Sequence, residues 1–162
     1  MDRLATLTPS LLDIGRDLLK LGVAYGLAIP IGWEREEHSH SAGIRTFPIV
    51  AAAACGFTML GTAVQGASPD SYSRMLQGLI TGIGFIGGGA ILRDKGGVTG
   101  PATAASIWSI GIAGAAVGLG FYHIAVVLAV INILTFRYLT PFKQRLDKRS
   151  ENDTQDSDNP TD

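Results

Sequence analysis

The chain has 162 residues, with 13 Lys and Arg against 14 Asp and Glu. The resulting net charge of −1 says nothing about nucleic acid, but no basic patch interleaved with aromatic residues occurs apart from a short C-terminal cluster. Only 17% of the residues are charged, nearly all in short clusters, and a soluble protein of this length could not cover the apolar stretches between them. The composition therefore predicts an integral membrane protein.

Five apolar segments follow one another along the chain. A hydrocarbon core about 30 Å thick requires roughly 20 apolar residues in each crossing helix. We expect helices to span the membrane at residues 18–33, 46–64, 75–92, 102–118 and 121–138. The last two lie within residues 96–136, which carry no formal charge, and turn at Gly118-Leu119-Gly120. The predicted fold is an all-α bundle of about five transmembrane helices.

The first helix has a local start signal. Ser10 and Asp13 have the spacing of a capping box, so we expect the helix to begin near Leu11. The residues before it lack the basic and short apolar regions of a cleavable signal peptide, and none is expected. Pro30, near the end of the first span, predicts a kink that is either a hinge or a tolerated irregularity.

A charged cluster closes the first span and continues into a polar loop. Its carboxylates could hold a divalent cation such as Mg²⁺, with Glu34 and Glu36 as the candidate ligands, and its histidines would suit a transition metal. The alternative, which we favour, is that Glu34 and Glu36 form ion pairs with Arg35 or Arg45. The side chains concerned are Glu34, Arg35, Glu36, Glu37, His38, His40 and Arg45.

The third span is rich in glycine. Gly78 with Gly82 and Gly84 with Gly88 have the spacing that lets helices pack closely in lipid, and packing against a neighbouring helix is the favoured interpretation. The alternative is local unwinding at residues 87–89, as in the broken helices of transporters. Residues 82–87 also match a dinucleotide-binding fingerprint, but the preceding strand and following acidic residue that it requires are missing.

The basic residues predict the orientation. With the C-terminus in the cytoplasm, nine of the 13 Lys and Arg lie in cytoplasmic segments and four outside. The positive-inside rule therefore favours an external N-terminus and a cytoplasmic C-terminus.

Four ordered motifs within residues 20–125 resemble those of the MgtC/SapB family of bacterial membrane proteins. They are Gly32-Trp33-Glu34-Arg35-Glu36, Ala42-Gly43-Ile44-Arg45-Thr46, the stretch from Gly82 to Leu92, and Thr103-Ala104-Ala105-Ser106-Ile107-Trp108. The resemblance implies functional positions at Glu34, Arg35, Glu36, Gly43, Arg45, Thr46, Gly82, Gly84, Gly87, Gly89, Thr103, Ser106 and Trp108.

The resemblance implies a multi-pass protein of the bacterial plasma membrane that takes part in magnesium homeostasis. We expect a protein without enzymatic activity or a firm cofactor, acting on another membrane protein, with a transporter of Mg²⁺ or another ion as the alternative. The expected partners are the bilayer, another membrane protein or a second copy, and no nucleic acid.

The sequence departs from the family pattern in three places. Phe47-Pro48 stands where the family often has a polar residue after Arg-Thr. Gly100-Pro101-Ala102-Thr103 replaces the usual Gly-Leu-Thr-Thr entry to the fourth span, so a proline starts that helix. In place of the soluble domain of longer members, a basic and then acidic tail at 143–162 follows the transmembrane domain at 1–142. We expect this cytoplasmic tail to be disordered.

Overall fold

Each expected span corresponds to one helix in a computed structural model of the chain, which describes residues 10–38, 42–63, 69–94 and 97–139. The tail predicted at 143–162 and His40 lie outside these residues, as do the side chains of Glu37 and His38. The helices are α1 (Leu11–His38), α2 (Thr46–Ala63), α3 (Pro69–Gly89), α4 (Pro101–Gly118) and α5 (Tyr122–Leu134), and α5 continues into the π-helical segment η2 (Thr135–Leu139).

A short β-hairpin, which was not predicted from the sequence, separates α3 from α4. Strands β1 (Leu92–Asp94) and β2 (Gly97–Thr99) pair antiparallel, with Arg93 opposite Val98. Gly100 then has a φ of 94°, and a Cβ there would collide with the carbonyl oxygen of Ala90. Glycine is therefore required at this turn, and Pro101 starts α4 as the sequence predicts.

The predicted start of α1 is confirmed. Ser10 Oγ lies 2.7 Å from Asp13 Oδ2, and the backbone N–H of Asp13 donates to Ser10 Oγ at 3.2 Å. The N–H of Ser10 donates to the same carboxylate, which completes the reciprocal capping box. At the other end, α1 continues through Pro30 as a single helix.

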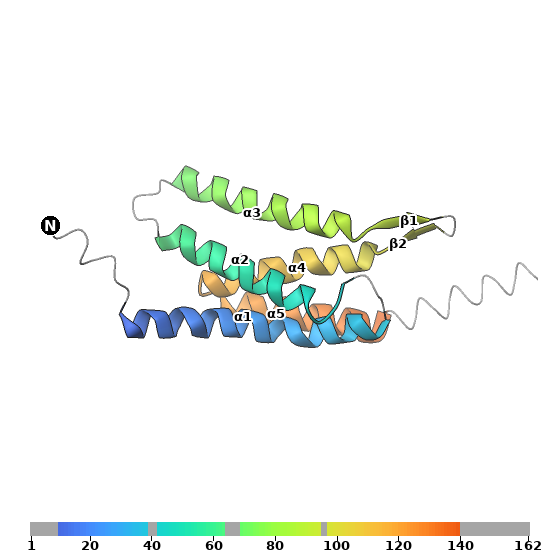
Figure 1. The fold of residues 1–162 in the computed structure, drawn as a ribbon, viewed down its shortest axis with the longest axis horizontal. Coiled ribbons are helices and arrows are strands. Elements are labelled where there is room, and N and C mark those ends of the chain that lie inside the picture. Colours follow the sequence, from blue (N-terminus) through green and yellow to red (C-terminus); the bar gives the residue numbers. More distant parts are fainter. Residues whose placement is uncertain (1–9, 39–41, 64–68, 95–96, 140–162) are drawn as a thin grey trace, which may run out of the picture.

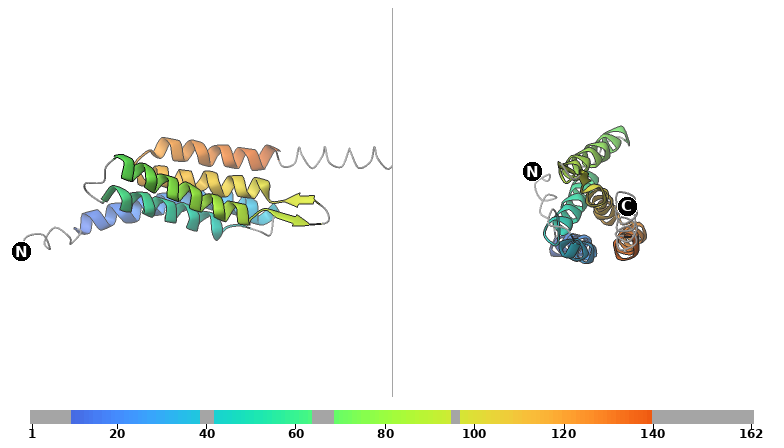
Figure 2. Two further views of the ribbon diagram at one scale, coloured as in Figure 1. Left: turned by 90° about the horizontal axis from the view of Figure 1, so that it is seen from above. Right: turned by 90° about the vertical axis from the view of Figure 1, so that its right-hand side faces the viewer.

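The helices are arranged in three layers. α1 and α5 form one outer layer, α2 and α4 the middle one, and α3 lies alone on the opposite side (Figures 1 and 2). α4 packs against all four other helices, whereas α3 packs mainly on α4 and contacts α2 less. The core therefore centres on α4, and α3 leaves much of its surface uncovered.

Small residues explain the central position of α4. A Cβ at Gly114 would collide with the carbonyl oxygen of Ala51, and one at Gly118 would collide with Thr58 Oγ1. Gly111 similarly receives the side chain of Ile83 from α3. The closest helix packing is thus on the fourth helix, where backbones approach through glycine, and less on the third, where the sequence predicted it.

Three helical segments are long and apolar enough to cross a bilayer: Thr46–Ala63, Pro101–Gly118 and Tyr122–Leu139. α1 and α3 are also long, at 28 and 21 residues. Charged residues lie near both ends of α1, and Asp70, Arg74 and Gln77 make the first half of α3 more polar.

Candidate functional site at one end of the bundle

The antiparallel course of the chain brings the sequence motifs to one end of the bundle. The C-terminal ends of α1 and α3, the N-terminal ends of α2 and α4, and η2 all lie there, next to the hairpin (Figure 1). Motifs that are far apart in the sequence therefore form one region, which we call the motif end.

Arg35 is the centre of the motif end. Its side chain is only 8% exposed although it carries a charge. Nη2 donates a hydrogen bond to Thr103 Oγ1 on α4, and the guanidinium lies 4.7 Å from the centre of the Phe136 ring on η2. Nε meets no acceptor within the described part of the chain. A neutral hydroxyl and an aromatic face thus provide the polar contacts of a buried cation, and they join α1, α4 and η2.

Glu36, one position further along α1, fastens the loop that leads into α2. Its Oε2 accepts the backbone N–H of Ile44 at 3.1 Å. A Cβ at Gly43 would collide with this carboxylate, and one at Gly32 would lie 2.9 Å from the Cα of Ile44. Gly32 therefore lets the loop lie against α1, and a side chain at position 43 would displace the carboxylate of Glu36.

These contacts correct the predicted ion pairs. Arg35 turns to Thr103 and Phe136, and Glu36 binds a backbone amide, so neither forms the expected pair with another described residue. Arg45 is exposed and likewise makes no ion pair within that part of the chain. Glu34 is half-buried and has a partner, whose identity stays untested.

The structure does not complete the cation site predicted at Glu34 and Glu36 within the described residues. Among the described side chains, no group of three His, Cys, Asp or Glu lies close enough to hold a metal ion. Glu36 already accepts a backbone hydrogen bond, and the nearby guanidinium of Arg35 disfavours a cation there.

The fourth motif lies on α4, with some side chains inside the bundle and one on its surface. Thr103 and Ser106 are buried, and Ser106 Oγ donates to the carbonyl oxygen of Ala102 at 2.7 Å within the helix. Trp108 is 45% exposed and so points out of the bundle. Thr46, the first residue of α2, is half-buried.

The motif glycines of α3 separate into two groups. Gly87 is buried, and a Cβ there would lie 3.0 Å from the carbonyl oxygen of Ala104, so it packs against α4 as predicted. Gly82, Gly84 and Gly89 are exposed, with nothing within 4 Å of a Cβ. Gly84 and Gly88 thus pack against no neighbouring helix within the described chain, and packing against a helix of another molecule, which the prediction also allowed, stays a prediction. The helix also continues through Gly89 without unwinding.

An open apolar groove lies beside this exposed face. It runs between α2 and α3 with a volume of about 370 Å³. Gly78 and Gly82 form part of its floor, and a Cβ at either would meet nothing within 4 Å. The groove-lining residues that matter below are Ile49, Ala53, Phe57, Gly78, Gly82 and Ile86.

The contacts of Asn132 with Ser109 and of Phe136 with Arg35 were not predicted from the sequence. Asn132 Nδ2 on α5 donates to Ser109 Oγ on α4 at 2.7 Å and to the carbonyl oxygen of Leu128 at 2.8 Å. A single Asn within an apolar span was the available signal, since such a side chain needs a partner. For Phe136 no signal existed, because only the fold brings its ring to Arg35.

Comparisons with known proteins agree with the motif pattern. The MgtC family matches residues 21–145. Protein SapB of Bacillus subtilis is 34% identical over 129 residues, which cover 75% of this chain and 56% of that protein. Protein MgtC of Salmonella typhimurium is 34% identical over 131 residues, which cover 81% of this chain and 55% of that protein. Protein SrpB of Synechococcus elongatus is 32% identical over 126 residues, covering 70% and 68%. The chain spans about half the length of the SapB and MgtC relatives. No solved structure matches significantly.

Proposed function

The chain belongs to the MgtC family, and from this premise we propose that it is a non-enzymatic protein of the bacterial plasma membrane that supports adaptation to low magnesium. In this proposal all five helices cross the bilayer, and the protein acts by binding a transmembrane helix of another membrane protein. The motif end faces the cytoplasm and holds the helices in their arrangement.

The exposed face of α3 is the observation that supports this function. Helices in lipid gain little from burying apolar surface, so close approach through small residues is what drives their association. Gly78 and Gly82 provide such an approach, and no part of the described chain covers them. The groove between α2 and α3 continues this surface with apolar side chains. A transmembrane helix of a partner fits a surface of this shape and chemistry.

Cation transport is the alternative, and the electrostatics of the motif end argue against a pathway there. A buried guanidinium such as that of Arg35 repels Mg²⁺ strongly, because the low dielectric of the site screens the two charges poorly. The exposed glycines, by contrast, have no role in an internal pathway.

Substitutions that the isolated chain tolerates provide the test. A Cβ at Gly82 meets nothing within 4 Å, so we expect Gly82→Leu to occupy the groove while the chain still folds. Gly22→Leu on α1 is its control, since a Cβ at Gly22 also meets nothing within 4 Å. We expect both variants to reach wild-type abundance in the membrane. In a strain that lacks the native gene, only Gly82→Leu should fail to restore growth at limiting Mg²⁺.

Two results would contradict the proposal. One is full growth with Gly82→Leu at normal abundance. The other is uptake of Mg²⁺ by liposomes that contain only the purified protein, which would instead establish the transporter.

A further inference from the structure

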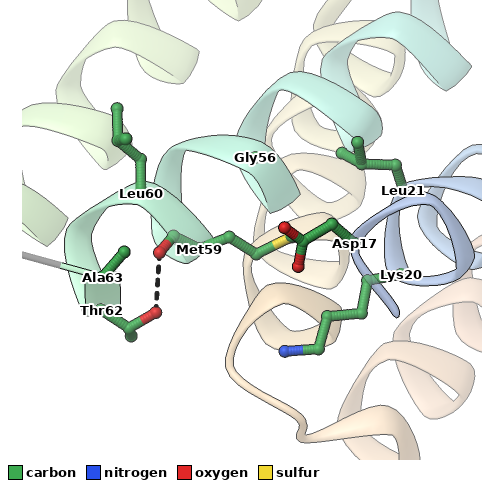
Figure 3. A pocket seen from close by; sticks show the side chains of 8 residues that line it. All are labelled: Asp17, Lys20, Leu21, Gly56, Met59, Leu60, Thr62 and Ala63. Atoms are coloured by element: carbon green, nitrogen blue, oxygen red, sulfur yellow. Dashed lines mark hydrogen bonds between the residues drawn. The ribbon is translucent and has the colours of Figure 1, made fainter. Parts of the chain in front are cut away.

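A second polar site lies at the opposite end of the bundle from Arg35. There α1 and the last turns of α2 border an open cavity of about 450 Å³ (Figure 3). α2 ends at Ala63 and α4 at Gly118, so the cavity lies near the C-terminal ends of these two helices. Its lining includes Asp17, Lys20 and Leu21 from α1, and Met59, Leu60 and Thr62 from α2.

Lys20 is partly engaged at one wall of this cavity. Its Nζ donates to the carbonyl oxygen of Gly118 at 3.1 Å, which places the ammonium at the negative end of the α4 dipole. An ammonium has three donors, so two remain for another group. This bond fixes the position of a positive charge at the edge of the cavity.

Asp17 provides the opposite charge. Its carboxylate is exposed and makes no hydrogen bond or ion pair with another residue in the described ranges. It lies on the same face of α1 as Lys20, one turn earlier. Ala63, the last residue of α2, lines the same cavity, and a helix C-terminus favours a cation. The cavity therefore has an acceptor side and a donor side.

We propose that this cavity binds the headgroup of a zwitterionic aminophospholipid, phosphatidylethanolamine. The ammonium of the lipid donates to Asp17, its phosphate accepts from the free N–H groups of Lys20, and its acyl chains start along Leu21 and Leu60. The cavity volume lies in the range of small-ligand sites. A divalent metal fits less well because the cavity holds one carboxylate and a nearby ammonium.

Lipid retention by the purified full-length protein tests this site. Native mass spectrometry would follow the protein in mild detergent with equal amounts of phosphatidylethanolamine, phosphatidylglycerol and phosphatidylcholine. The wild type should retain phosphatidylethanolamine selectively. Asp17→Asn removes a charge-assisted hydrogen bond and should lower its retention relative to phosphatidylglycerol about tenfold. Asp70→Asn, an exposed position at the same end of the bundle, makes the same charge change outside the cavity and should have no effect.

Ala63→Phe tests the cavity without a change of charge. The added ring should fill the cavity and lower lipid retention even if Asp17→Asn does not fold. The proposal would be overturned if the wild type showed no preference, or if folded Asp17→Asn kept it. Displacement of the lipid by an equal concentration of water-soluble phosphoethanolamine would also overturn it, because Leu21 and Leu60 would then contribute nothing.

Discussion

At glycine positions in this bundle, the effect of a substitution depends on what faces the missing Cβ. A Cβ at Gly114 would collide with the backbone of Ala51, whereas one at Gly84 would meet nothing within 4 Å. Alanine at position 114 should therefore force α2 and α4 apart, at a cost of roughly 1 to 3 kcal/mol. Alanine at position 84 should stabilise α3 by up to about 1 kcal/mol, because alanine favours helix more than glycine does.

Unfolding of both variants in detergent micelles would check this contrast. Gly114→Ala and Gly84→Ala remove the same kind of residue and add the same single methyl group. Equal stability of the two would show that the packing of α4 does not determine the fold as the structure indicates.

The buried guanidinium of Arg35 makes a second residue-scale prediction. Thr103→Val keeps the shape of the side chain but removes the acceptor from Nη2, leaving a charge without its hydrogen bond. We expect a loss of about 1.5 to 3 kcal/mol in the free energy of unfolding, whereas Thr103→Ser keeps the hydroxyl and should lose much less.

A double variant distinguishes the loss of packing from the cost of leaving the Arg35 charge without its hydrogen bond. Arg35→Met together with Thr103→Val removes both polar partners, so the pair should be less destabilised than the sum of the two single changes. Additive losses in the same unfolding measurement would show that the two side chains do not interact.

At the scale of the element, the start of α1 should respond to pH. Hydrogen bonds from the Ser10 side chain and backbone lower the pKa of Asp13 below its ordinary value. A carboxyl whose pKa is lowered by folding stabilises the folded helix end above its unfolded pKa, and that contribution is lost as the pH falls through the folded pKa. The first turn of α1 should therefore fray below about pH 4.

Ser10→Ala should weaken this dependence by removing the side-chain bond to Asp13. Its effect would be measured by hydrogen exchange of the first-turn amides between pH 3 and 6, a range set by the ordinary pKa of about 3.9 for Asp. If the wild type and Ser10→Ala frayed over the same pH range, the capping box would have no role at this helix end.

The elements themselves were largely predictable, and their contacts only in part. Uncharged stretches and the Ser10–Asp13 spacing located the helices, because hydropathy and capping act locally along the chain. The position of α3 was not predictable, since glycine spacing alone does not tell which helix has a neighbour. Gly84 and Gly114 both occur in small-residue patterns, and only the fold shows that the second is covered.

At the scale of the whole molecule, the sequence motifs converge because the helices alternate in direction. Arg35 lies on α1, Gly43 in the loop before α2 and Thr103 on α4, and the resemblance marked them as functional positions without showing that they meet. The partners of Arg35 and Glu36 could not be predicted from charge. A hydroxyl, a ring and a backbone amide replaced the carboxylates and cations that simple pairing suggests.

The orientation of the molecule in the membrane is the last prediction. Of the described Lys and Arg, four lie at the motif end and three at the other, and five more of the 13 occur in the sequence at 95 and 143–149. Since Lys and Arg remain on the cytoplasmic side of bacterial membranes, the motif end should face the cytoplasm. A reporter fused after Arg149 should then behave as cytoplasmic, and one fused at Asp70, at the start of α3, as periplasmic. Both fusions must keep the protein at wild-type abundance for the comparison to hold. Reporters on the same side of the membrane would contradict a bundle of five crossing helices, because the three crossings of α3, α4 and α5 between the two fusion points must place them on opposite sides.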